Sequence, residues 1–443
     1  MLGERQSSSF FCRRAVLSIL SLLVLCCILS SAPSVFVAAA TNDDNDNDDD
    51  DAGFGQLVVW MTQQGGRVHP NIQVGVRHGI RGIVSKQTLQ EGDEVLYCPW
   101  KLVLGSTSLE DKMTKHSDRM CHVVHDMARE IKLGVDSLWF PYLTHIELPR
   151  LPAIWEDSAL EELQGLGPTQ DATRHLQWFQ QACASSSTET GGGGSDVSSL
   201  DPSIMRSLVS FISRASEVGM IPIYDLLNHH NGKRNAKLTI EQDGVHLNVV
   251  GGDIPKGEQL YLSYGVKSAA TMFRDYGFVE EWPVIYNFLD ATSGDNFAFV
   301  VLAEDSDNAN SNATQVAINP TSQFLEGLWR SNMPLSDYQA TARQHMESLS
   351  REEWLRFARA AQRRLEAFPT TWHQDTNILA DKTKQLNETL ATNIDDDIIR
   401  SNLQDILGAI QYRRAFKQAL EKAATSCEAM LAQRSRATTK QEL

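Results

Sequence analysis

The decapeptide IPIYDLLNHH, residues 221–230, is an apolar run that ends in one amide and two imidazole side chains. Three explanations compete for Asn228, His229 and His230: metal ligands, catalytic bases, or side chains that hydrogen-bond the backbone of a buried crossing. Adjacent residues of a strand point to opposite faces, so His229 and His230 are poorly placed to share one ion. We therefore predict no metal site and expect these side chains to satisfy buried backbone groups.

Strand patterns punctuated by glycine lie on both sides of this segment. Residues 73–103 are strand-like, and their turn LQEGDEVL has a near echo in IPKGEQLYL, residues 254–262. Each echo places an apolar residue, two spacers, a glycine and an acid before a strand, which predicts a turn followed by a strand. Two alternating strands around Asp243-Gly244 predict a β-hairpin.

Helical patterns interrupt and follow these strands. Residues 109–182 contain the helical segments MCHVVHDMAREIKLG and SALEELQGL, and residues 185–199 have the composition of a flexible linker. From about residue 320 the pattern is helical, with an apolar stripe spaced i, i+3, i+4 and i+7 between Leu403 and Ile410. We predict an α+β chain with strands on both sides of a helical insert and a helical C-terminal third.

The N-terminal residues are typical of a segment that directs secretion. Arg13 and Arg14 precede an apolar stretch, residues 15–29, and the small-residue sequence SVFVAAA follows. This order predicts a secretory signal peptide in residues 1–40, or an uncleaved signal anchor, because residues 15–40 are long enough to span a bilayer. We expect the chain to enter the secretory pathway, for the endoplasmic reticulum, secretion or a single-pass membrane location.

Acidic charge dominates the rest of the chain. Residues 41–53 include seven aspartates between Asp43 and Asp51, which predicts a solvated, disordered linker. The formal net charge of the whole chain is −16. An acidic protein is poorly suited to a nucleic-acid backbone, so we expect no nucleic-acid partner, but it suits a basic segment of a protein substrate.

Cysteines and short motifs exclude several kinds of site. There is no C-x-x-C pair, G-x-G-x-x-G or P-loop, and Ser263 lacks the flanking glycines of a nucleophile elbow. Glycosylation sequons begin at Asn312 and Asn387 and are usable only in the secretory pathway. An oxidising compartment would permit one or two disulfides among four scattered cysteines, whose pairing stays open. These cysteines are Cys98, Cys121, Cys183 and Cys427.

Three segments together resemble a known family. HGIRGIVSKQTLQEGDEVL, IPIYDLLNHH and GEQLYLSYGVKSAATMFRDYGF occur in the order and approximate spacing of SET-domain methyltransferases. The chain resembles the subgroup that includes the Rubisco large-subunit lysine methyltransferase and the actin-histidine methyltransferase, and the insert and the C-terminal AIQYRRAFKQALEKA match as well. The resemblance covers about residues 75–424. Each motif is weak alone, whereas the ordered set is specific.

The resemblance implies a fold and a domain division. The fold is α+β: a SET-domain β-fold with a helical insert and a knot-like crossing, followed by an all-α C-terminal substrate-binding lobe. The SET domain would span residues 54–290, with its insert at about 109–200, and the lobe would span residues 291–443. We expect a monomer that contacts a membrane only through an uncleaved N-terminal segment.

The resemblance also assigns residues. Tyr264 matches the catalytic tyrosine, whereas His230 stands where the family has a small polar residue and receives no role. The positions that match a pocket for S-adenosyl-L-methionine are Gly79, Ile80, Arg81, Arg214, Asp225, Asn228, His229, Tyr264, Tyr276, Gly277 and Phe278.

The implied activity is methyl transfer from S-adenosyl-L-methionine to a lysine side chain of a protein. A lysine of pKa about 10.4 must lose a proton first, at a free-energy cost of roughly 4–5 kcal/mol at pH 7. Burial beside a cationic sulfonium lowers that pKa, and Tyr264 would orient the amine. The alternatives are a histidine acceptor, or a binding module that keeps the fold without turnover.

Overall fold

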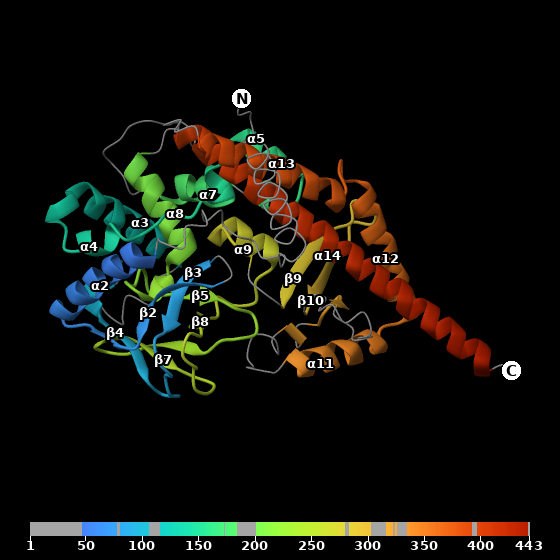
Figure 1. Cartoon of the computed structure of the whole chain (residues 1–443), viewed down its shortest axis with the longest axis horizontal. Helices are drawn as coiled ribbons and strands as arrows, with labels where there is room; N and C mark the ends of the chain where they lie inside the picture. Colours follow the sequence, from blue (N-terminus) through green and yellow to red (C-terminus); the bar gives the residue numbers. More distant parts are fainter. Residues whose placement is uncertain are drawn as a thin grey trace, which may run out of the picture. The chain divides into compact units, whose positions relative to one another are not determined.

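The computed structural model describes residues 47–77, 80–105, 116–171, 173–183, 201–279, 283–302, 316–321, 324–325, 335–391 and 397–441. They lie within one compact unit, residues 36–443 (Figure 1). Among them, no helix is both long and apolar enough to cross a membrane. Gly79, Asn312 and the segment expected to direct secretion lie outside the described residues.

The first element is helix α2 (Asn47–Gln63), which includes residues 47–53 of the segment that we expected to be a disordered linker. The strands that follow pair antiparallel, β2 with β3 and β1 with β4. The elements are β1 (Arg67–Val68), β2 (Ile72–Arg77), β3 (Ile80–Ser85), β4 (Glu94–Pro99) and the 3-10 turn η1 (Trp100–Leu102).

A helical insert follows, and its two ends meet. Leu104 and Met220 exchange two backbone hydrogen bonds of 3.0 Å, so the chain leaves and re-enters the strand region at one place. A disulfide joins Cys121 to Cys183, which resolves the pairing that the sequence left open. The elements are α3 (His116–Leu133), η3 (Gly134–Asp136), α4 (Phe140–Leu143), η4 (Pro152–Ile154), α5 (Asp157–Glu161), α6 (Gly167–Asp171), α7 (Arg174–Cys183) and α8 (Pro202–Arg214).

The chain then returns to the strands. The hairpin predicted around Asp243-Gly244 is confirmed, because β6 and β7 pair antiparallel across it, and β7 also pairs with β4 in a sheet of order β1-β4-β7-β6. A separate parallel pair joins β5 to β8. The elements are η7 (Tyr224–Leu226), β5 (Asn228–His229), β6 (Ala236–Ile240), β7 (Gly244–Val249), β8 (Tyr261–Leu262) and α9 (Ala269–Tyr276).

The two echoed turns contact each other. Leu89 and Ile254, the first residues of the echoes, exchange backbone hydrogen bonds of 2.9 and 2.8 Å. The glycine of each echo has a left-handed backbone, with φ of 93° at Gly92 and 81° at Gly257, which favours glycine at both turns. A similarity that the sequence showed only as a pattern is therefore a local pairing in space.

The helical C-terminal region that we predicted is present as α11–α14, and strands precede it within residues 291–443. Strands β10 and β11 lie inside that range and form a three-stranded antiparallel sheet with β9. Their alternating aromatic and β-branched residues favour strands. The elements are β9 (Val284–Leu289), β10 (Asn296–Val301), β11 (Val316–Ile318), α11 (Leu335–Ser348), α12 (Arg351–Glu366), α13 (Trp372–Ala391) and α14 (Asp397–Gln441).

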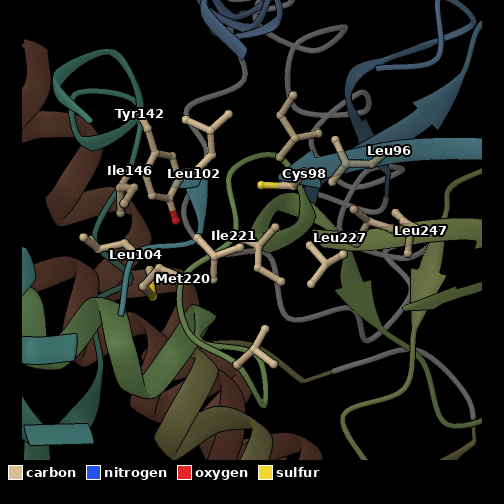
Figure 2. Close-up of a cluster of buried hydrophobic side chains, with 14 of the residues drawn as sticks. Leu96, Cys98, Leu102, Leu104, Tyr142, Ile146, Met220, Ile221, Leu227 and Leu247 are labelled. Carbon is tan, nitrogen blue, oxygen red and sulfur yellow. The ribbon is translucent and has the colours of Figure 1, made fainter. Parts of the chain in front are cut away.

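The two larger hydrophobic cores of the described residues support these parts. In the first core, residues such as Leu96 and Leu247 of the sheet pack with Tyr142 and Met220 (Figure 2). The second core joins β9–β11 to α12 and α14 through aromatic contacts, including Phe299 with Phe357. Full burial of each such side chain contributes about 1.5–3 kcal/mol. The first core surrounds the segment that ends in NHH.

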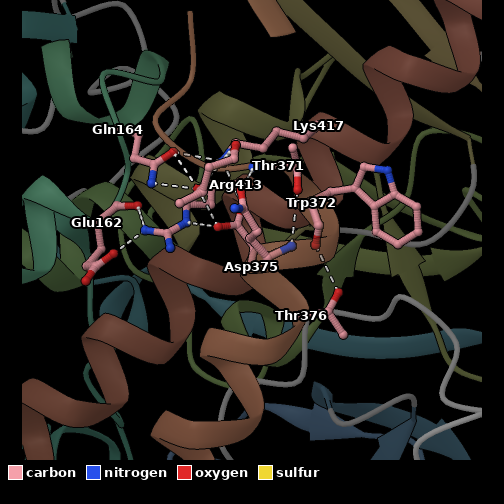
Figure 3. A network of polar contacts seen from close by, with 10 residues as sticks. Glu162, Gln164, Thr371, Trp372, Asp375, Thr376, Arg413 and Lys417 are labelled. Carbon is pink, nitrogen blue, oxygen red and sulfur yellow. Dashed lines mark hydrogen bonds and ion pairs between the residues drawn. The ribbon is translucent and has the colours of Figure 1, made fainter. Parts of the chain in front are cut away.

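A charged network joins the insert to the C-terminal helices (Figure 3). Asp375 of α13 accepts hydrogen bonds from Arg413 Nε (3.0 Å) and Lys417 Nζ (2.7 Å) of α14, and all three side chains are fully buried. Arg413 also contacts the carboxylate and the carbonyl of Glu162, and Lys417 contacts Gln164 Oε1 at 2.8 Å. The insert therefore packs against α13 and α14 through buried charges.

Candidate functional site

The segment that ends in NHH lies between two other strand segments. Strand β5 runs parallel to β8, with Asn228 opposite Tyr261 and His229 opposite Leu262. Just before β8 the chain pairs with β3, where Leu260 N donates to Ile83 O at 2.8 Å. Strand β5 therefore lies beside both β8 and β3, which are joined to each other through Leu260 and Ile83. We call this arrangement of β3, β5 and β8 the crossing.

Asn228 connects β5 to β3. Its Nδ2 donates to the carbonyl oxygen of Arg81 at 2.8 Å. A Cβ atom on Gly82 would lie 1.9 Å from Gln259 Nε2 and 2.6 Å from Asn228 Nδ2, so both amides pack directly against a residue that must be glycine. The amide predicted at position 228 therefore satisfies backbone at the crossing.

His229 is held in one tautomer. Its Nδ1 accepts the backbone N–H of Tyr264 at 3.0 Å, so Nε2 carries the proton and donates to Asn231 Oδ1 at 3.1 Å. Burial lowers the pKa of His229 to about 4. The ring is therefore neutral at physiological pH and acts as a fixed pair of hydrogen-bonding groups.

His230 has a separate environment. Its Nδ1 accepts the backbone N–H of Gly232 at 2.9 Å, and its ring stands edge-on to Tyr261 with centroids 5.1 Å apart. Burial lowers its pKa to about 3. Neighbouring His229 and His230 thus bind different backbone groups, as the alternation along a strand requires.

Tyr264 points back at the crossing. Its hydroxyl donates to the carbonyl oxygen of Leu227 at 2.5 Å, and its ring stacks on His229 with centroids 5.1 Å apart. Burial raises the pKa of Tyr264 well above its usual value. The hydroxyl therefore stays protonated at neutral pH and can orient a neighbouring group but cannot serve as a base.

The DYGF segment lies beside Tyr264. The rings of Tyr264 and Tyr276 have centroids 4.8 Å apart, and burial raises the pKa of Tyr276 to about 12. Helix α9 ends at Tyr276 because Gly277 adopts φ of 79°, a left-handed C-cap. Phe278, the next residue, is half-buried. The glycine predicted at position 277 thus turns the chain directly after the tyrosine that lies beside Tyr264.

Asp225 is buried next to the crossing. Its Oδ2 accepts the hydroxyl of Tyr142 at 3.0 Å and lies 3.8 Å from Nη1 of Arg214, which donates to the Asp225 carbonyl. Burial raises the pKa of Asp225. The residue two before it, Ile223, has φ of 68°, a strained conformation for a β-branched residue that costs about 1–3 kcal/mol.

A small cavity lies against Asp225. Its volume is about 10 Å³, close to the minimum for one water molecule. Arg81 lines it beside Asp225, and Ile80, the residue before Arg81 in β3, is half-buried. The lining residues come from α2, β3, the insert and η7: Phe54, Leu57, Arg81, Tyr142, His145, Ile146, Asp225 and Leu226.

The structure therefore brings together most of the predicted site residues. Arg81 contacts Asn228, Asn228 precedes His229, and His229 contacts Tyr264. Asp225 lines the same cavity as Arg81, and Arg214 donates to the Asp225 carbonyl. Three further residues were missed: Gly82, Tyr142 and Gln259. The HGIRG glycine pattern could have indicated Gly82, whereas Tyr142 in the insert has no local sequence signal.

Within the described residues, one group has side chains that could hold a metal ion: Glu241, Asp243 and His246. It lies on the β6–β7 hairpin, away from the crossing. Nε2 of His246 pairs with Asp243 at 3.2 Å and Nδ1 with Glu94 at 2.9 Å, so ion pairs account for its arrangement. His229 and His230 do not belong to this group.

The structure is similar to solved SET-domain structures. The SET domain of LSMT bound to methyl-lysine and AdoHcy aligns with a TM-score of 0.49 and 18% identity, over 86% of this chain and 92% of that one. Rubisco LSMT bound to AdoMet aligns with a TM-score of 0.49 and 19% identity, over the same shares. No protein-family model matches the chain. No curated protein matches it either.

Proposed function

We propose that this protein is an S-adenosylmethionine-dependent protein N-methyltransferase that acts on lysine. The observation that carries the proposal is the position of Tyr264, whose hydroxyl donates to Leu227 at the crossing while its backbone is fixed by neutral His229. The ordered SET-like motifs support the same conclusion. A displacement at a sulfonium requires positioning of a neutral nucleophile and little further chemistry.

The residues around the crossing fit the proposed cofactor. Oδ1 of Asp225 is buried without a hydrogen-bond partner in the structure, so it could accept a hydrogen bond from an ammonium or hydroxyl group. Arg81, Asp225 and Asn228 would hold the cofactor, which supplies an electrophilic methyl group when bound. The small volume of the cavity implies that side chains around it move when the cofactor binds.

Tyr264 and Tyr276 would act on the acceptor. Burial raises the pKa of both tyrosines and keeps their hydroxyls protonated at neutral pH. The Tyr264 proton is donated to Leu227, so the hydroxyl oxygen can accept an N–H of the neutral amine and leave the nitrogen lone pair free to attack the methyl group. Their adjacent rings exclude water and offer aromatic faces to a cationic methylated product. The acceptor loses its proton to solvent before it enters this environment, where a low dielectric favours the neutral amine.

Helices α11–α14 would bind the protein substrate away from the reacting atoms. Contacts made there could position the acceptor side chain at Tyr264 without taking part in methyl transfer. Hydrogen exchange of the intact protein, with and without its substrate, tests this part. Protection confined to the crossing would contradict a docking role for the helices.

Calorimetry with S-adenosylmethionine is the first test of the proposal. Asn228→Ala should weaken binding by about tenfold or more, because one lost hydrogen bond to a charged or buried group costs about 1.5–3 kcal/mol. Asn248→Ala is the matched control, since Asn248 of β7 bonds Thr239 away from the crossing. Equal binding by the wild type and Asn228→Ala would remove Asn228 from the site.

Methyl transfer is the second test. Isotopically labelled S-adenosylmethionine should label a protein in an extract of the source organism, and Tyr264→Phe should reduce the rate far more than it reduces cofactor affinity. Tyr97→Phe removes a comparable hydroxyl bond, to Asp243 O at 3.2 Å, and should keep the rate. Label on histidine would support the alternative acceptor, and cofactor binding without label would support a binding module.

A further inference from the structure

One sequon lies on the exposed side of a C-terminal helix. Asn387, Glu388 and Thr389 are in the last turns of α13. Asn387 is exposed, whereas Leu386 is buried against Leu403 and Leu407 of α14. The helix therefore directs the Asn387 amide into solvent, and the described neighbours leave it accessible.

An independent feature indicates the compartment in which the chain matures. The Cys121–Cys183 disulfide joins α3 to α7. Disulfides form and persist in oxidising compartments and are rare in reducing ones. This disulfide agrees with the signal peptide or anchor expected in residues 1–40, and the same compartment contains the machinery that glycosylates N-x-S/T sequons.

We infer that Asn387 carries an N-linked oligosaccharide. In this reaction Nδ2 of Asn387 loses a proton and bonds to C1 of the first sugar. The bond from C1 to a lipid-linked diphosphate breaks, and the diphosphate leaves with the electron pair. The donor is thus a lipid-linked oligosaccharide of the secretory pathway, and the reaction requires no oxidant or reductant.

The folded geometry places this reaction before helix formation. In the folded chain, Thr389 Oγ1 donates to the carbonyl oxygen of Gln385 at 2.9 Å, so the hydroxyl of the sequon is engaged within α13. Modification therefore occurs on the nascent chain, before α13 packs against α14. After folding, the surface around Asn387 has room for the glycan, because the nearby Lys384–Glu388 pair is largely exposed.

A glycan at this position limits how the helices can be used. It would cover the outer face of the C-terminal half of α13. A protein substrate that docks on α11–α14 would then have to bind other faces of these helices. The inference holds independently of the proposed methyl transfer, because it rests on the sequon, its exposure and the disulfide.

Expression of the full chain in eukaryotic secretory cells tests the inference. Mass spectrometry of peptides, after an amidase removes glycans in ¹⁸O water, should show conversion of Asn387 to labelled aspartate in most molecules. Asn387→Gln and Thr389→Val should abolish that signal, and Thr389→Ser should keep it. Asn377→Gln, at an exposed asparagine of α13 outside any sequon, should leave it unchanged.

The disulfide makes a negative result informative. Unmodified Asn387 in a chain that contains the Cys121–Cys183 disulfide would overturn the inference directly, because the chain would have reached the compartment without using the sequon. Unmodified Asn387 in a chain without the disulfide would also overturn it, together with the secretory route. A signal from Asn312 alone would count against Asn387.

Discussion

The crossing and the insert–helix network solve the problem of buried polar groups in opposite ways. At the crossing, Asn228 and His229 are uncharged, and each satisfies backbone groups of a neighbouring strand. In the network, Asp375, Arg413 and Lys417 are charged groups that satisfy one another. Neutral groups tolerate small movements better than buried charges, because an unpaired charge costs far more than an unpaired amide. The crossing is suited to rearrangement around a ligand, and the network to rigid attachment.

The first prediction concerns the charged network and has the largest expected effect on the free energy of unfolding. Asp375→Asn keeps the shape but leaves Lys417 buried without a compensating carboxylate and Arg413 paired with Glu162 alone, so the free energy of unfolding should fall by about 3–5 kcal/mol. Denaturant unfolding measures it. Glu388→Gln, which breaks the exposed pair with Lys384, should cost no more than about 0.5 kcal/mol. Similar losses in both variants would contradict the assigned role of burial.

The disulfide should have the next largest effect, within the insert that links the two regions. The Cys121→Ala/Cys183→Ala variant should lose about 2–4 kcal/mol of unfolding free energy, because the bond restricts the unfolded chain between positions 62 residues apart. Thermal unfolding with and without reductant measures it. Reductant should lower the Tm of the wild type and leave that of the variant unchanged. A variant as sensitive as the wild type would implicate another disulfide.

Packing at the crossing should have a smaller effect. Gly82→Ala forces Gln259 and Asn228 to move and should cost about 1–3 kcal/mol, and Gln259→Ala in the same chain should recover part of the loss. Gly55→Ala is the control, since Gly55 is exposed in α2 with open space around it and alanine favours the helix. Absence of any recovery in the double variant would mean that Gln259 is not the obstacle.

Acid should distinguish the two regions with the smallest effect. Burial places the pKa values of His229 and His230 at about 4 and 3, below the unfolded value near 6.5. Stability that is present above pH 6.5 is therefore lost as pH falls towards 4, and at pH 6 the loss should be about 0.8 kcal/mol for each histidine. Protonation of His229 Nδ1 would also release the Tyr264 N–H. The hydrogen-exchange protection factor of that amide should therefore fall at pH 5. Protection around Arg413 should change less, and equal loss in both regions would contradict the prediction.

The sequence predicted the crossing far better than the network. Asn228, His229 and Tyr264 lie in short motifs whose order carries information, so the α+β class was foreseen, and the structure brings most of the predicted site residues together. Asp375 lies in a mostly polar helix, and nothing near it in sequence indicates that Arg413 and Lys417 will bury it. Strands β10 and β11 were missed because they are short segments within a range otherwise read as helical.

The bridge between Leu104 and Met220 has a consequence for how the protein can be altered. The two ends of the insert meet at hydrogen-bonding distance. A longer insert therefore does not require the strands at its two ends to move. Doubling a loop costs only about 0.6 kcal/mol of closure entropy. A grafted sensor or reporter domain could therefore be inserted within residues 185–199, where the sequence predicts a flexible linker outside the described residues, and the crossing should stay intact as long as Tyr142 keeps its hydrogen bond to Asp225.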